Sequence, residues 1–148
     1  MRRLSILGAI GLLLISASMV SAASGTRVWQ AKVQVGAASG GASLALSANG
    51  KAASVAVKLY HVTPATKVTV ALYDGARLSS TQPPLTLIVS PRAFKAPSAG
   101  SAVHRFWLMK SDLATLKTDI TASNHVFSVF ITATGTATAT ACVNLTSR

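Results

Sequence analysis

The chain has 148 residues, half of them hydrophobic, with 14 Lys and Arg residues against 3 Asp and Glu residues. This length allows one domain with or without a processed segment, but hardly two domains. The hydrophobic content excludes ordinary disorder, and the single cysteine excludes a disulfide scaffold. Glu is absent and only Asp74, Asp112 and Asp119 carry a carboxylate, so the composition argues against most acid–base enzymes.

The N-terminus has the three parts of a secretory signal peptide. Two arginines come first, a mainly apolar stretch runs from Leu4 to Ile15, and Val20-Ser21-Ala22 offers the small residues that signal peptidase requires. The apolar stretch is shorter than the roughly 20 residues of a spanning helix, with an uncleaved membrane anchor as the alternative. We predict a signal helix at residues 1–22, cleaved near Ala22. The remaining residues 23–148 form a secreted or periplasmic domain with 12 basic and 3 acidic residues, a net charge of +9.

The first half of this domain alternates between apolar and polar residues, which is typical of strands with one buried face. Residues 28–35 form the first predicted strand, with Trp29 and Val33 on its buried face and Lys32 on the other. The segment from Gly36 to Gly41 is predicted as a flexible hairpin connection.

Two further strands are predicted at residues 43–47 and at Ala53–Tyr60, the second burying its valines and exposing Ser54 and Lys58. They flank Asn49-Gly50, a strong hairpin signal because both residues accept positive φ.

The second half continues with a strand from Lys67 to Tyr73 and a short strand from Leu85 to Val89. A loop follows from Pro91 to Gly100. Residues 103–109 are apolar on both faces, which indicates a central strand or one whose outer face meets something. Ser111 to Leu116 is predicted as a single helical turn capped by Ser111, and the chain closes with a hairpin of strands at 125–133 and 137–145.

Seven or eight short strands with turn signals between them predict an all-β fold, an antiparallel Greek-key β-sandwich that follows the signal helix. A small closed barrel is the alternative. A parallel sheet is not expected, because no helical segment is long enough for a crossover.

Metal and catalytic sites find little support in the sequence. His61, His104 and His125 could in principle converge on a metal ion, but no His-x-His or His-x-x-x-His spacing occurs. No Gly-x-Ser-x-Gly motif is present, and Cys142 has no charged sequence neighbour to activate it. We therefore predict no catalytic residue, no metal ligand and no cofactor. Cys142 is interpreted as a small buried hydrophobic residue, with intermolecular disulfide pairing as the alternative.

Basic residues are scattered through strands and loops without any run, so they indicate a solubilising surface or a weak, salt-sensitive attraction to anionic polymers or envelope components. Specific nucleic-acid binding is not indicated, because basic clusters interleaved with exposed aromatics are missing. Membrane contact is expected only through the signal segment before cleavage. Asn144-Leu145-Thr146 fits an N-glycosylation sequon.

One family resemblance can be stated. The run Ala52–Gly75, AASVAVKLYHVTPATKVTVALYDG, joins two strands through a proline turn. Together with the strand that follows Pro84 and the final hairpin, it resembles the Greek-key sandwich of the chordin-type (CHRD) domains and their copper/zinc superoxide dismutase-like relatives. Where such proteins carry His-x-His on the second strand, this chain has Val70-Ala71-Leu72-Tyr73, so the resemblance implies an exported, non-catalytic sandwich without the metal-binding motif.

The sequence thus favours an exported, non-enzymatic β-sandwich that acts as a surface, envelope or extracellular interaction module. The alternative is a metal-dependent enzyme using His61, His104 and His125. A third hypothesis is a subunit that assembles by adding strands between chains.

Overall fold

The computed structural model describes residues 25–98, 100–120 and 125–148, so the predicted signal helix lies outside the described residues. Eight strands and one helix follow one another along the chain: β1 (Arg27–Val35), β2 (Ala38–Leu46), β3 (Ala53–Tyr60), β4 (Lys67–Asp74), β5 (Thr86–Lys95), β6 (Ser101–Trp107), α1 (Lys110–Asp119), β7 (Phe127–Thr134) and β8 (Thr138–Ser147). The predicted all-β class is confirmed.

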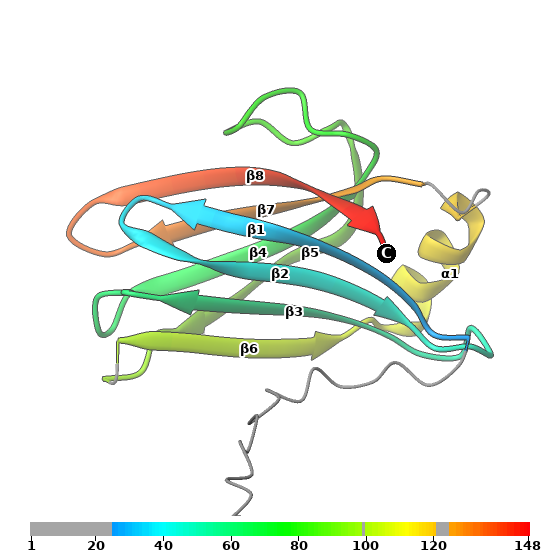
Figure 1. Ribbon diagram of the computed structural model, residues 1–148, viewed down its shortest axis with the longest axis horizontal. Coiled ribbons are helices and arrows are strands. Elements are labelled where there is room, and N and C mark those ends of the chain that lie inside the picture. The colour runs from blue at the N-terminus through cyan, green and yellow to red at the C-terminus, as the bar shows by residue number, and fades with distance from the viewer. Residues whose placement is uncertain (1–24, 99, 121–124) are drawn as a thin grey trace, which may run out of the picture.

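The strands form one sheet in the order β5-β4-β7-β8-β1-β2-β3-β6, and every neighbouring pair is antiparallel. The sheet curves round until it is nearly closed, with β2, β3 and β6 in front of β4 and β5 in Figure 1. β5 and β6 end the order without a ladder between them. The rings of Phe94 and His104 stack across this seam, with centroids 4.6 Å apart.

The core lies inside this curved sheet, because alternate residues of each strand point inward. On β1 the inward residues include Trp29 and Val33, and on β3 they include Val55, Val57 and Leu59, as the alternation predicts. α1 covers one end of the sheet, next to the start of β7 in Figure 1, and its Leu116 is fully buried in the core.

Two predictions about strand limits are wrong. The segment Gly36–Gly41 is not a long connection, because β2 already begins at Ala38 and pairs with β1 through Ser39, Gly40 and Gly41. The predicted loop after Pro91 is also strand, since β5 continues to Lys95. Its register on β4 shifts between Val70 and Leu72, and proline is tolerated at such a bulge in an edge strand.

The helix also differs from its prediction. α1 spans ten residues, and its N-cap is Met109, without a side-chain hydrogen bond, so Ser111 lies inside the first turn and caps nothing. Ser54, expected to be exposed, is buried on β3.

The loop between β4 and β5 covers the outer side of β8. The backbone carbonyl of Ser80 accepts a hydrogen bond from the backbone N–H of Cys142 at 2.7 Å. The Arg77 guanidinium donates a hydrogen bond to the Cys142 carbonyl at 2.8 Å. Cys142 is fully buried, as expected, but it is not part of the core cluster inside the sheet. Burial raises the pKa of its thiol, and the positive charge of Arg77 only partly opposes this shift.

Gly40 and Gly41 provide a direct test of the β2–β3 packing. A Cβ atom at Gly40 would overlap the carbonyl oxygen of Lys58, whereas one at Gly41 would lie an ordinary 3.5 Å from the Ala31 oxygen. We expect Gly40→Ala to lower the free energy of unfolding by about 2 kcal/mol or more, as overpacking does. Gly41→Ala should leave it nearly unchanged. Equal urea midpoints for the two variants would contradict this account.

Candidate functional site

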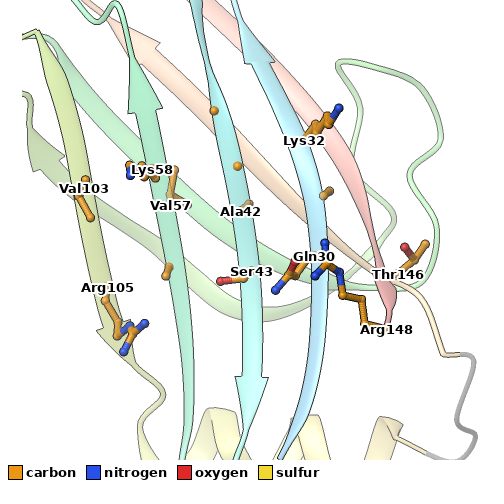
Figure 2. Close-up of a pocket in the computed structure, with 14 residues that line it drawn as sticks. Gln30, Lys32, Ala42, Ser43, Val57, Lys58, Val103, Arg105, Thr146 and Arg148 are labelled. Atoms are coloured by element: carbon orange, nitrogen blue, oxygen red, sulfur yellow. The ribbon is translucent and has the colours of Figure 1, made fainter. Parts of the chain in front are cut away.

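A broad groove of about 570 Å³ lies on the outer face of β1, β2, β3 and β6. Figure 2 shows its residues, with β2 running along the middle and longer side chains on the strands to either side. The outward positions of β2 are Ser39, Gly41, Ser43 and Ala45, so no long side chain rises from this strand. This run of small residues makes the groove possible.

The pairing register places the residues of the groove in rows across the strands. Lys32, Gly41, Lys58 and Val103 form one row, from β1 through β2 and β3 to β6. The next row contains Gln30, Ser43, Ala56 and Arg105, and Gln30 also pairs with Thr146 of β8.

Four of the residues that line the groove are basic. Lys58 and Arg105 lie on one side of β2 in Figure 2, and Lys32 and Arg148 on the other. No acidic residue lines it. Two of the three aspartates face positive or titratable partners elsewhere, Asp112 at 3.9 Å from Arg92 and Asp74 against His125. The lining of the groove therefore carries several cationic side chains and no carboxylate side chain.

Exposed aromatic side chains flank the groove but do not line it. The Lys58 ammonium lies 4.9 Å from the centre of the Tyr60 ring, within cation–π range. Trp107 is 62% exposed at the end of β6, beyond Arg105. β6 is thus an edge strand with an exposed outer face, not a central strand.

This groove was not predicted from the sequence. The basic residues were interpreted as scattered, because Lys32, Lys58 and Arg105 lie far apart along the chain. The signal that could have found it is the alternation of β2, whose outward residues are all small. That alternation can be recognised only if β2 begins before Gly41, whereas the predicted strand began at residue 43.

The three histidines lie in separate parts of the structure. His61 follows β3 in a turn with positive φ, and His104 is in the seam against Phe94. His125 precedes β7, where its ring contacts Phe127 and Asp74. Within the described ranges, no group of three or more His, Cys, Asp or Glu side chains could hold a metal ion, so the histidine-based metal enzyme has no assembled ligand set.

A small charged cluster lies at the end of the sheet that α1 covers. Asp74 contacts the His125 ring, and the Trp29 indole donates a hydrogen bond to the His125 carbonyl at 3.0 Å. One oxygen of Asp119 is buried without a hydrogen-bond partner among the described residues. Burial raises the pKa of Asp119, Asp74 raises it further, and His125 opposes both. The cluster does not line the groove.

Comparison with known protein families, curated proteins and solved structures finds no match to this chain. In the part of the chain that the structure describes, no helix has the length and apolar character needed to cross a membrane.

The raised pKa of Asp119 predicts a pH-dependent term in stability. A carboxyl with a raised folded-state pKa contributes stability that is fully present below its ordinary value of 3.8 and is lost as the pH rises through the folded pKa. Asp119→Asn should therefore be more stable than the wild type at pH 7 and lose this advantage near pH 3.

Thermal or urea unfolding across this pH range measures the effect. Asp112→Asn is the control, because it removes another carboxylate of the same helix, whose half-buried ion pair with Arg92 at 3.9 Å contributes about 1 kcal/mol at most. A lower stability of Asp119→Asn at pH 7 would contradict the prediction.

Proposed function

We propose that the chain is exported and that its mature β domain is a non-enzymatic module that binds anionic polymers in the basic groove. The observation that carries this proposal is the group of cationic side chains around a floor of small residues, with no acidic residue in the lining. Export is supported by the signal-like sequence of residues 1–22.

Electrostatics supports the choice of an anionic ligand. Like charges in one groove repel each other, and a polyanion would relieve this repulsion while being attracted by several cations at once. Lys58 and Arg105 are on adjacent strands, and their register places them diagonally, about 7–8 Å apart at the backbone. Lys32 is two strands from Lys58, about 10 Å across β2. This spacing suits a chain with repeated charges better than a single small anion.

We further propose the Greek-key topology and the CHRD- and superoxide dismutase-like relationship for this fold. In support, β7 lies beside β4, and β6 lies beside β3, although neither pair is consecutive in the chain. The Phe94–His104 contact brings β5 next to β6. With these neighbours, β4, β5 and β6 would be three consecutive strands and β7 the fourth that returns beside the first, which defines a Greek key.

A salt series with charge variants tests the function. The purified mature domain should bind polygalacturonate at low salt and lose affinity between about 50 and about 200 mM salt. Replacing Lys32, Lys58 and Arg105 with Gln should weaken binding about a hundredfold at low salt, if each cation contributes about 1 kcal/mol as at anionic surfaces.

The matched control replaces Lys67, Lys95 and Lys117 with Gln. These lysines are exposed outside the groove, so this variant removes the same total charge. It should weaken binding far less than the groove variant. An equal loss would show that net charge and not the groove attracts the polymer. Failure of the wild type to bind any polyanion at low salt would overturn the proposed function.

A further inference from the structure

We infer that the ligand of the groove is a linear acidic polysaccharide that lies lengthwise along β2, between the side chains of β1 and those of β3 and β6. The inference rests on the proposed function and adds the class of polymer, its direction and the residues that set its width. Three features of the groove support it.

The first feature is the shape of the floor. Gly41 and Ser43, the outward residues of β2 that line the groove, carry no side chain larger than a hydroxymethyl group. Ser39 and Ala45, the next outward positions on either side, are equally small. β1 and β3 flank β2 at one strand spacing each, which leaves a trough about 10 Å wide between their backbones. One extended chain can therefore lie over the small residues of β2, between the longer side chains of its neighbours.

The second feature is the kind of polar group along the trough. Gln30 and Ser43 line it, and Thr146 of β8 lines the groove beside Gln30. These side chains offer amide and hydroxyl groups that both donate and accept hydrogen bonds. Sugar hydroxyls have the same dual character, so these side chains can bond to a neutral part of the chain. Lys32, Lys58 and Arg105 supply the donors for carboxylate or sulfate groups.

The third feature distinguishes a polysaccharide from a nucleic acid. Single-stranded nucleic acids bind to basic grooves largely through stacking of their bases on aromatic side chains. No aromatic residue lines this groove. Tyr60 lies in the row of Ser39 and Trp107 in the row of Ala45, each one row outside the lining residues Gly41 and Ser43. A polymer held by hydroxyl and charge contacts fits the lining better than one held by stacked bases.

Gly41 is the position where the inference can be tested without changing any charge. It faces outward on β2, and a Cβ atom there would meet only an ordinary contact. Gly41→Phe should fill the trough while the basic side chains remain. Thr132→Phe is the matched control, because Thr132 lies outward on β7, away from the groove.

The experiment measures binding of oligogalacturonides, from the disaccharide to the octasaccharide, to the mature domain by calorimetry. Affinity should rise with length until the trough is filled and then level off. Gly41→Phe should weaken the longer oligomers at least about tenfold, and Thr132→Phe should match the wild type. Cello-oligosaccharides of equal length, which lack the charge, should bind more weakly than the acidic series.

Several outcomes would overturn the inference and leave the proposed function standing. If Gly41→Phe binds as the wild type does, while the Lys32, Lys58 and Arg105 variant loses affinity, the polymer is held by charge but does not occupy the trough. Tighter binding of oligo(dT) than of galacturonides of equal charge would assign the groove to nucleic acid. Should Gly41→Phe fail to fold, Ser43→Phe fills the same trough and gives the same decision.

Discussion

The two halves of the sheet meet at a short junction, where β1 and β8 form two residue pairs, Trp29–Ser147 and Gln30–Thr146. The backbone N–H of Arg148 adds a hydrogen bond to the Val28 carbonyl at 3.2 Å. Trp29 is buried beside this junction. Its ring meets that of Phe127 edge to face at 5.2 Å, and its N–H reaches across to the His125 carbonyl. Gln30 and Thr146, which line the groove, form the other pair of the junction. The contacts of Trp29 therefore help to hold β1, the strand that carries Gln30 and Lys32 of the groove, against the second half of the sheet.

How far the sequence predicts the fold depends on how local its determinants are. β3 matches its predicted limits, because alternation and the Asn49-Gly50 turn act over neighbouring residues. β5 does not, since its continuation past Pro91 requires a bulge opposite β4, which is a property of the pair and not of the segment. α1 was underestimated for a similar reason. Leu116 stabilises it by packing into the core, and no local cap marks its start.

The candidate site was out of reach of the sequence for a different reason. Lys32, Gly41 and Lys58 form one row only through the register of three strands, and Arg105 joins its neighbouring row through a strand that pairs out of chain order. Composition did give one correct element, the surplus of bases over acids. Where the positive charge gathers on the surface depends also on where the three aspartates lie. Asp74 and Asp112 both have partners outside the groove.

The loop over Cys142 has a consequence for behaviour at high concentration. β8 meets β1 only near its C-terminal end, so the middle of its outer edge has no neighbouring strand there. An open edge of this kind is a template on which another molecule can add a strand and begin a fibril. Ser80 and Arg77 occupy the N–H and the carbonyl of Cys142. The loop thus acts as a short substitute strand, and it blocks the addition of a strand from another molecule at Cys142.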